Sequence, residues 1–511
     1  MRRDDLVVGL SLANLCLLRA WKEVLALAGP TGYYLSPATS LPWALLLDVL
    51  VLGTLFAAGA HLARRSGDAR LLHVARALFL LALLIPLDAL RTEFRVPRLF
   101  EFATWVLEPA GRPIPLRDLA PLIPIAVFAR WPARSARYAR ATLLFFAPFV
   151  LVTFGRATWL GIRHPIGTAY AERPSAPALP AAAPGAPRVL VLVFDELDQR
   201  LAFGERPAGL ELPALDGLRS EGLYASSATP PSWETLLSFP ALLAGRMVVA
   251  ARAVGPSALL LRFEGEADAV HDWRGEQSVF TRARALGVNG GLVGWYHPYC
   301  RVLDALTRCA WEPYFDVINR GGGAGLGGAM IEQLRSLSPW DRQRRHILGY
   351  RRILDEALTA ATDSTLGVVF VHWPVPHHPF IYDPARDRLT VHRYGATGYV
   401  DQLRLVDKTV AELRAALERV GLWAATTVIV TSDHAARVKD RPEEGSRRDE
   451  RVPFVVKLPG SAGGSSYDRS FSTVMLSDFV LAVLRREVTA PAQAARWLDR
   501  NAPPRPVQAR R

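Results

Sequence analysis

The chain has 511 residues, of which 50% are hydrophobic, and its mean hydropathy is positive at +0.13. This length allows two or more domains, and the hydropathy is high for a soluble protein. Lys and Arg outnumber Asp and Glu by 61 to 48, so the formal net charge is +13. The three cysteines, Cys16, Cys300 and Cys309, show neither CxxC nor Cys/His finger spacing, which argues against a cysteine-based zinc site.

Residues 1–165 carry repeated apolar runs. A membrane-spanning helix needs about 20 apolar residues, and the sequence predicts five spans, of which the fourth is short. No small-residue cleavage site follows the first run, so we expect a retained anchor and not a removed signal peptide. The predicted spans are Leu6–Ala28, Leu41–Ala63, Leu71–Leu90, Leu119–Trp131 and Thr142–Ile162.

Basic residues outside these runs predict the orientation of the spans. Residues 1–3, 61–70 and 129–140 are basic, whereas residues 29–40 carry no charge. Placing the basic segments in the cytoplasm puts everything after Ile162 on the other side, with a mild conflict at Arg91–Leu116. This topology accounts for most of the basic excess, so no nucleic-acid partner is predicted.

Two charged residues, Arg19 and Lys22, fall inside the first apolar run. Either they reach the membrane surface with their long side chains or they face a polar cavity.

A Pro- and Ala-rich stretch, residues 172–187, has the composition of an extended linker. The predicted organisation is therefore a transmembrane domain at 1–168, a linker at 169–187, a soluble domain at 188–490 and a basic, Pro-rich tail at 491–511. Within the tail, residues Arg496 to Arg511 are expected to be disordered.

Residues 188–194 form a continuous apolar run of β-formers, which is typical of a central parallel strand. Further strands are predicted at 291–295, 366–372 and 426–431, with helical patterns between them, notably at 402–420. This alternation predicts an α/β domain with a mainly parallel sheet flanked by helices. Ligands of such sheets bind at the carboxyl ends of the strands.

Each predicted strand ends in carboxylate or imidazole side chains, which suit zinc or manganese. Taken singly, an Asp or His after a strand is as well explained as a cap of the next helix. Their coincidence at four strand ends favours one site. The residues are Asp195 and Glu196, His297, His372 with His377 and His378, and Asp433 with His434.

Residues 230–246 predict a loop that becomes a short helix and ends at Gly245. Ser232 is a suitable N-cap, and Thr235 falls in the first turn, where free N–H groups form an anion site. A hydroxyl there can attack a phosphate or sulfate if a cation lowers its pKa. Alone, the segment is better explained as a capped amphipathic helix; together with the strand ends it favours Thr235 as a nucleophile.

Six segments of the soluble half occur in a recognisable order: Phe194–Leu197, Thr235–Arg246, Gly294–His297, Pro376–Phe380, Thr431–His434 and Arg451–Phe454. They resemble the successive motifs of the sulfatase-like branch of the alkaline phosphatase superfamily, over about residues 188–460. Glu196 replaces the second Asp of the first metal motif, and the Lys before the third motif's His is missing. Thr235 takes the place of the Cys that sulfatases convert to formylglycine.

The Thr at this position cannot become formylglycine, so the resemblance shifts from sulfate hydrolysis toward phosphoryl transfer. Thr-x-x-Ser-x-Pro resembles the lipoteichoic acid synthases and phosphoethanolamine transferases, which carry five membrane spans before an extracytoplasmic catalytic domain. The resemblance implies a multi-pass protein of the cell's inner (cytoplasmic) membrane with its catalytic domain on the periplasmic side. Its implied substrates are a membrane lipid and an envelope glycan; no oligomeric state is predicted.

The mechanism implied by the resemblance uses a divalent metal, zinc being favoured over manganese, magnesium or calcium. We expect Glu196, Thr235, Asp433 and His434 to hold it, with Asp195 assisting or holding a second ion. The Thr235 alkoxide would form a phospho-threonine that an acceptor hydroxyl or water resolves.

Histidines are expected to complete this site: His297, His377 and His372 would hold phosphoryl oxygens or protonate the leaving group. For His378 and His392, a substrate contact and a packing role are equally favoured. Two other functions stay open, namely a sulfatase-like hydrolase (a phosphodiesterase or a sulfuric ester hydrolase) and a catalytically inactive envelope protein.

Cys300 and Cys309 are close in sequence and lie on the exported side, which predicts a disulfide, with two buried free thiols as the alternative. Cys16 lies in the first predicted span and is expected to be unpaired.

Overall fold

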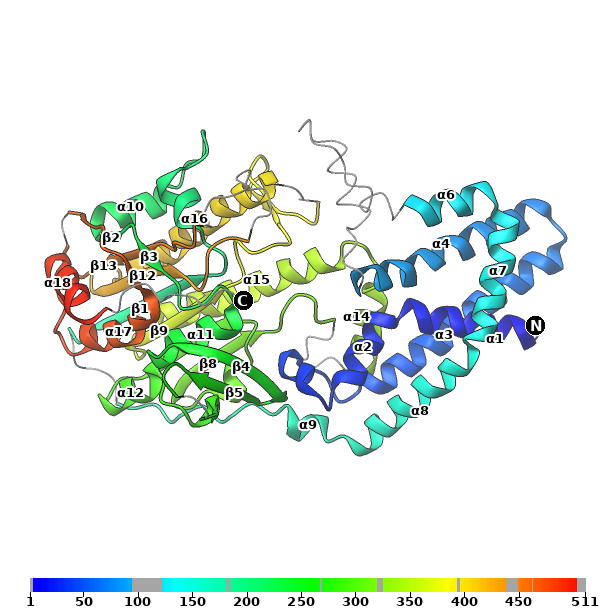
Figure 1. The fold of residues 1–511 in the computed structure, drawn as a ribbon, viewed down its shortest axis with the longest axis horizontal. Coiled ribbons are helices and arrows are strands. Elements are labelled where there is room, and N and C mark those ends of the chain that lie inside the picture. Colours follow the sequence, from blue (N-terminus) through cyan, green and yellow to red (C-terminus); the bar gives the residue numbers. More distant parts are fainter. Residues whose placement is uncertain are drawn as a thin grey trace. The chain divides into compact units, whose positions relative to one another are not determined.

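The computed structural model describes residues 3–93, 122–180, 183, 185–266, 269–318, 325–392, 396–437, 449–461 and 463–502. The chain divides into two compact units (Figure 1). The first comprises Met1–Tyr170 together with Asp316–Arg342, and the second comprises Ala171–Phe315 together with Gln343–Arg511. The segment 316–342, which the sequence analysis placed in the soluble domain, therefore packs with the N-terminal helices.

The first unit is helical. Among its described residues, α3 and the part of α4 up to Arg91 are long and apolar enough to cross a membrane, and α7 with α8, bent by 45°, passes the same test as a pair. Its helices are α1 (Arg3–Cys16), α2 (Leu18–Ala26), α3 (Leu41–Ser66), α4 (Ala69–Glu93), α6 (Leu122–Arg130), α7 (Pro132–Phe145), α8 (Ala147–Arg163), α9 (Ile166–Ala169) and α14 (Leu326–Arg335).

Five spans were predicted, and the described residues contain two such helices, or three if the bent pair is one span. The second and third predicted spans coincide with α3 and α4. The first is interrupted at Leu17, which separates α1 from α2, so neither piece has the length to cross. The fourth corresponds to the nine residues of α6, and residues 119–121 at its start lie outside the described part of the chain.

Polar side chains tie the first unit together. Arg19 of α2 lies 2.7 Å from Asp88 of α4, so its charge is paired inside the unit. Glu23 accepts a hydrogen bond from the backbone N–H of Ile318 at 2.5 Å, and Gln333 of α14 donates to the carbonyl of Leu41 at 3.2 Å. These bonds account for the attachment of segment 316–342 to the N-terminal helices.

The second unit is built on an eight-stranded sheet of order β14-β2-β13-β12-β1-β9-β7-β8. All neighbours pair in parallel except β13, which runs antiparallel to β12 and β2. The strands are β1 (Arg188–Phe194), β2 (Leu223–Ala225), β7 (Gly290–Trp295), β8 (Leu306–Glu312), β9 (Val368–Trp373), β12 (Thr426–Ser432), β13 (Phe454–Lys457) and β14 (Ser465–Tyr467). The prediction of a mainly parallel α/β sheet is confirmed.

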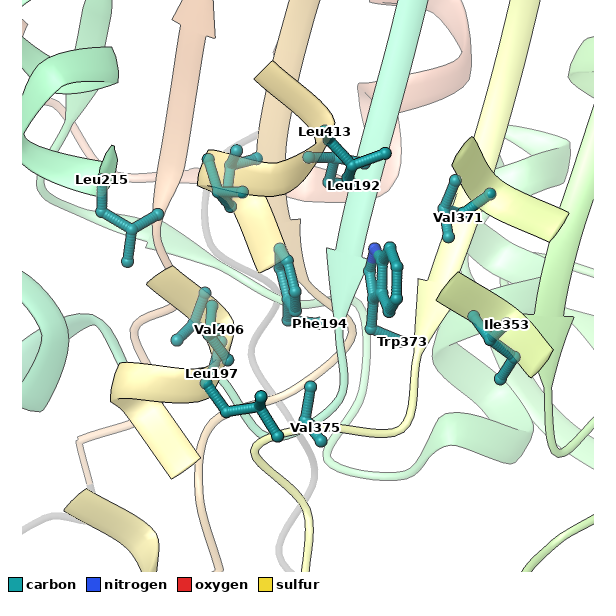
Figure 2. Packing of buried hydrophobic residues seen from close by; sticks show 14 of the residues in the cluster. Leu192, Phe194, Leu197, Leu215, Ile353, Val371, Trp373, Val375, Val406 and Leu413 are labelled. Atoms are coloured by element: carbon teal, nitrogen blue, oxygen red, sulfur yellow. The ribbon is translucent and has the colours of Figure 1, made fainter. Parts of the chain in front are cut away.

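Helices cover both faces of this sheet. On one face, α10 (Pro213–Glu221), α15 (Asp341–Thr362) and α16 (Ala396–Arg419) form the main core with β1 and β9. Figure 2 shows this layer, where the rings of Phe194 and Trp373 stack with centroids 5.8 Å apart. Successive strand residues face opposite sides, and Phe370 on the other face packs against Phe280 of α12 (Val279–Ala285). Helix α17 (Leu476–Leu484) contacts β1.

Arg188 at the start of β1 anchors the end of α15. Its guanidinium donates to the carbonyl oxygens of Ala361 at 2.6 Å, Asp363 at 3.0 Å and Leu366 at 3.0 Å. A cation that satisfies the last carbonyls of a helix also interacts favourably with the helix dipole. The contact fixes α15 against the strand that leads to the candidate site.

The C-terminal residues differ from the predicted tail. Residues Pro491–Asn501 form α18, and the ring of Trp497 packs against Phe479 of α17 with centroids 5.2 Å apart. Ala494, Trp497 and Leu498 are buried, at the i, i+3, i+4 spacing of one helix face. This apolar face explains why the segment folds despite its arginines; residues 503–511 lie outside the described part.

Candidate active site

The strand register brings the ends of β1, β9 and β12 to one edge of the sheet. Phe194, the last residue of β1, pairs with Ser432 of β12 and with Trp373 of β9. The Ser432 hydroxyl lies 2.6 Å from the carbonyl oxygen of Phe194 and accepts the N–H of Leu197 at 3.0 Å. This cross-strand brace positions Asp195 and Asp433, which follow the two strands directly.

Thr235 begins α11 (Thr235–Ala244), which ends as predicted at Gly245, a residue with φ of +73°. The N-cap position is occupied by Glu234 and not by Ser232, which was expected to cap the helix. Ser232 instead exchanges hydrogen bonds with Ser238: its N–H donates to the Ser238 hydroxyl at 3.1 Å, and that hydroxyl donates to the Ser232 carbonyl at 2.9 Å. The loop before Thr235 is therefore held by the side chain of Ser238 in the helix.

The Thr235 hydroxyl lies in a buried cluster of acidic and imidazole groups. It donates to Oδ2 of Asp433 at 2.7 Å and lies 3.3 Å from Oδ2 of Asp195 and 3.4 Å from Nε2 of His434. All four residues are at most 5% exposed. The structure therefore brings together four residues that the sequence placed in one site.

The hydrogen bonds of His434 select its tautomer. Its Nδ1 lies 3.0 Å from the carbonyl oxygen of Ala435, which can only accept, so the proton is on Nδ1. Nε2 then carries a lone pair, and it lies 3.5 Å from Asp195 and 3.7 Å from Asp433. This backbone contact is the arrangement that orients a metal-binding histidine.

The carboxyl of Asp195 lies in an unfavourable environment for its charge. Burial first, and then the nearby carboxylates of Asp433 and Glu196, hold its pKa well above the usual value, while Arg437 and the Thr235 hydroxyl act in the opposite direction. Its Oδ1 has no hydrogen-bond partner among the described residues. Buried carboxylates without donors are costly unless a cation neutralises them.

Among the described residues, two groups of side chains could hold a cation. Asp195, His372 and Asp433 place one ligand atom each within 4.8 Å of one another, and so do Glu196, His377 and His378. With its orphaned carboxylate oxygen, and with Nε2 of His434 3.5 Å from Asp195, the site around the first cluster fits a divalent cation such as zinc or manganese.

Glu196 belongs to the second of these groups, and its side chain points toward His377. Its φ is +66°, and its carbonyl accepts the Tyr399 hydroxyl at 2.6 Å. Its Oε1 lies 3.9 Å from Nε2 of His377. Of the two acidic residues that follow β1, it is therefore Asp195 that contacts the Thr235 hydroxyl, together with Asp433, whereas the metal set expected from the resemblance gave the main role to Glu196.

His372 is held by two aromatic side chains. The indole N–H of Trp295 donates to its Nε2 at 3.2 Å, and its Nδ1 lies 2.8 Å from the hydroxyl of Tyr299. Burial and the neighbouring His297 hold its pKa well below the usual value, so the ring is neutral. Its nearest approach to Asp195 is 3.9 Å. These contacts give His372 a bracing position behind Asp195.

His297 contacts the backbone of Thr235. Its Nε2 lies 3.2 Å from the carbonyl oxygen of Thr235, and burial lowers its pKa to about 3. The neutral ring donates Nε2–H to that carbonyl. His297 therefore orients the first turn of α11, a role that the sequence analysis did not consider.

His377 and His378 lie on a loop that a third histidine holds. The ring of His377 stacks on His378 with centroids 4.4 Å apart, and burial holds the pKa of His377 well below its usual value. His346 of α15 lies 2.7 Å from the carbonyl oxygen of Pro379 through Nδ1 and 3.0 Å from that of Pro374 through Nε2. His346 spans both ends of the loop, and no motif in the sequence pointed to it.

His392, for which a substrate contact and a packing role were equally favoured, is exposed. The predicted disulfide between Cys300 and Cys309 is present and joins α13 (Tyr299–Val302) to β8. Arg437, which sequence reasoning did not single out, contacts His434 and the ring of Trp233.

Comparison with known proteins assigns the chain to a family. The family model described as Sulfatase matches residues 187–485, which is more than half of the chain. No curated protein matches the chain.

Solved structures give weaker likenesses. The phosphonate monoester hydrolase of Agrobacterium radiobacter is 16% identical, with a TM-score of 0.41 over 58% of this chain and 74% of that one. The PsFucS1 sulfatase from Pseudoalteromonas sp. is 17% identical, with a TM-score of 0.39 over 58% and 68%. The family assignment rests on the family model and not on these structures.

Proposed function

Because the chain belongs to the sulfatase family, within the alkaline phosphatase superfamily, we propose that it is a membrane-anchored, divalent-metal-dependent phosphotransferase with Thr235 as nucleophile. It would move a phosphoryl-linked group from a membrane lipid to an envelope glycan or lipid. The observation that carries the proposal is the 2.7 Å contact between the Thr235 hydroxyl and Asp433 inside the buried acidic cluster. A threonine cannot supply the formylglycine of ordinary sulfatases, which favours phosphorus over sulfur.

Asp195, Asp433, His434 and the Thr235 oxygen would hold the metal, with Glu196 and His377 as further donors. When bound, a divalent cation lowers the pKa of a coordinated hydroxyl and offsets phosphoryl charge. Zinc fits the nitrogen and oxygen donors, with manganese, magnesium or calcium as alternatives.

The chain's own residues then account for each bond change. Asp433 Oδ2 takes the Thr235 proton, and the bond from Oγ1 to phosphorus forms as the bond from phosphorus to the leaving oxygen breaks. His297 keeps the first turn of α11 in place through the Thr235 carbonyl. His378, which is exposed beside His377, delivers a proton to the leaving oxygen. An acceptor hydroxyl then gives its proton to His378 and attacks phosphorus, the bond from phosphorus to Oγ1 breaks, and Asp433 returns the proton to Thr235.

A hydrolase is the second candidate, because the family is one of ester hydrolases and the first half of the reaction is the same. Water would take the place of the acceptor, giving a phosphodiesterase or a sulfuric ester hydrolase. Retention of the acidic and imidazole cluster around Thr235 argues against an inactive envelope protein.

We place the second unit on the periplasmic side of the inner membrane in a multi-pass protein. Two apolar helices long enough to span support membrane anchoring, and the Cys300–Cys309 disulfide suits an oxidising compartment.

The test is phospholipid and glycan mass spectrometry on cells that express the full chain or its Thr235→Ala variant. We expect an envelope lipid or glycan that carries an added phosphoethanolamine- or glycerophosphate-sized group only with the intact chain. If the phosphoryl-linked group is found only in free form and on no acceptor, the protein is a hydrolase. Phosphoryl transfer would be refuted if the two strains carried the same phosphate-containing groups on their lipids and glycans and only the strain with the intact chain lost sulfate esters.

A further inference from the structure

Trp233 and Arg437 lie side by side at the exposed rim of the candidate active site. Trp233 precedes Thr235 by two residues and is 50% exposed; among the described residues of the second unit it is the only exposed aromatic side chain. Arg437 follows His434 by three residues, is exposed, and places its Cζ 5.4 Å from the centroid of the Trp233 ring. An exposed indole two residues before Thr235 is available to contact a bound molecule.

The guanidinium of Arg437 is only partly engaged. Its Nη2 donates to the carbonyl oxygen of Trp233 at 2.8 Å and lies 3.2 Å from Nε2 of His434. A guanidinium carries five N–H donors, of which Nη2 supplies two. In the part of the chain that the structure describes, the donors on Nε and Nη1 have no acceptor, and Arg437 forms no ion pair. A cation and these donors thus remain available for an anion.

This guanidinium adjoins the reaction centre. Nε2 of His434, which it contacts, is 3.4 Å from the Thr235 hydroxyl oxygen. Its charge also reaches Asp195, whose pKa it acts to lower. The lone pair of His434 Nε2 can accept the Arg437 N–H or bind a metal cation, but not both. When a metal cation binds there, Arg437 keeps its hydrogen bond to the Trp233 carbonyl. The N–H released from His434 then points toward the bound anion. A phosphorus atom attacked by Thr235 therefore has its non-bridging oxygens within reach of Arg437.

We propose that Trp233 and Arg437 form a substrate subsite in which the guanidinium binds a non-bridging phosphoryl oxygen and the indole contacts the apolar part of the esterifying alcohol. The proposal rests on the proposed function and names its substrate class, a phosphate diester of an alcohol with apolar surface. Arginine binds phosphate through parallel N–H donors, which adds affinity and orientation. A tryptophan face excludes water from the neighbouring alcohol.

The test uses the full-length protein in detergent, loaded with zinc or manganese. The variants are Arg437→Gln, Arg437→Lys and Trp233→Ala. The matched control is Arg469→Gln, which removes an exposed arginine that pairs with Asp499 at 2.8 Å, away from the site. Inorganic phosphate binding is measured by calorimetry, and steady-state cleavage is measured with bis(4-nitrophenyl) phosphate and with a short-chain phosphatidylethanolamine, which separate a soluble ester from a lipid.

For Arg437→Gln we expect phosphate affinity to fall and KM to rise by about tenfold with kcat changed by less than about threefold, because a charge-assisted contact is lost. Arg437→Lys should fall between this variant and the intact chain. Trp233→Ala should raise KM for both esters by about fivefold and leave phosphate affinity unchanged, since phosphate carries no alcohol. Arg469→Gln should match the intact chain throughout.

The proposed subsite would be overturned if Arg437→Gln and Arg469→Gln had the same phosphate affinity and the same KM. So would an Arg437→Lys protein indistinguishable from the intact chain, a comparison that decides the matter if the Gln variant does not fold. An intact chain that binds and cleaves only sulfate esters would overturn the proposed function instead. In that case sulfate affinity replaces phosphate affinity, and an unchanged affinity in the Arg437 variants rejects the subsite separately.

Discussion

The Thr235 hydroxyl and Oδ2 of Asp433 are 2.7 Å apart although 198 residues separate them in the chain. Two elements produce this contact: α11 begins at Thr235, and β12 ends just before Asp433. Neither residue belongs to a local motif that contains the other. The parallel register of β1 with β12 fixes the end of β12 beside the end of β1, and the first turn of α11 brings Thr235 to the same edge of the sheet.

Replacement of Thr235 by Ala should abolish phosphoryl transfer, by a factor of about 10³ or more, because no other oxygen takes the nucleophile's place. Thr235→Ser keeps the hydroxyl and should retain part of the activity. The measurement is cleavage of bis(4-nitrophenyl) phosphate, with metal content determined on the same samples. Full activity in Thr235→Ala would remove Thr235 from the mechanism.

Metal content should depend on the buried cluster. Asp433→Asn and His434→Gln should lower the bound zinc or manganese by about tenfold or more. The first variant removes the negative charge of a carboxylate ligand, and the second removes the imidazole Nε2. Asp468→Asn, an exposed carboxylate that accepts from Ser226 at 2.8 Å, is the matched control. Elemental analysis after dialysis against a chelator gives the result. Equal metal in Asp433→Asn and Asp468→Asn would show that the cluster does not hold it.

Tyr299 should act through His372. Tyr299→Phe removes the acceptor of the buried Nδ1–H, and leaving such a donor unpaired costs about 1–3 kcal/mol, so thermal stability and kcat should both fall. Tyr467→Phe is the control because it removes the 3.0 Å bond to Asp499 outside the site. Its kcat should be unchanged. The bracing role of His372 is refuted if Tyr299→Phe keeps the stability and kcat of the intact chain.

Periodicity in the sequence predicted the sheet well. The run at 188–194 is buried on both faces in the middle of the sheet, and an apolar run of β-formers with polar residues directly after it is the pattern of such a strand. Convergence of Asp195, Asp433 and His434 then follows from strand direction alone. Gly245 likewise ended α11 where a positive φ was needed.

Contacts that depend on tertiary packing could not be predicted in the same way. His346 lies in α15 and reaches two loop carbonyls more than 25 residues later, and nothing near it in sequence marks that role. Hydropathy did not reveal the break at Leu17, because an apolar run reads the same whether its backbone is continuous or interrupted. The orientation of Glu196 toward His377 depends on its positive φ. The residue type does not predict this backbone angle, because glutamate rarely adopts it.

Lys457 should give the second unit a measurable pH dependence. It is buried on β13, donates to the carbonyl oxygens of Trp423 at 2.6 Å and Thr426 at 3.1 Å, and burial lowers its pKa to about 8 from an ordinary 10.5. Between these two pKa values the unfolded chain binds more protons than the folded one, so this group makes the free energy of unfolding rise with pH. Its stabilising contribution is complete above the unfolded pKa and is lost as the pH falls through 8.

The thermal midpoint of the intact chain, relative to that of Lys457→Met, should therefore rise by roughly 2 °C or more from pH 7.5 to pH 10. Circular dichroism in detergent, with buffers matched in ionic strength, gives both midpoints. Lys408→Met, which removes an exposed lysine that pairs with Asp387 at 2.5 Å, is the control and should follow the intact chain. Parallel midpoint curves for the intact chain and Lys457→Met would mean that the buried amine keeps its ordinary pKa. The backbone carbonyls around Trp423 would then stabilise its charge as well as water does.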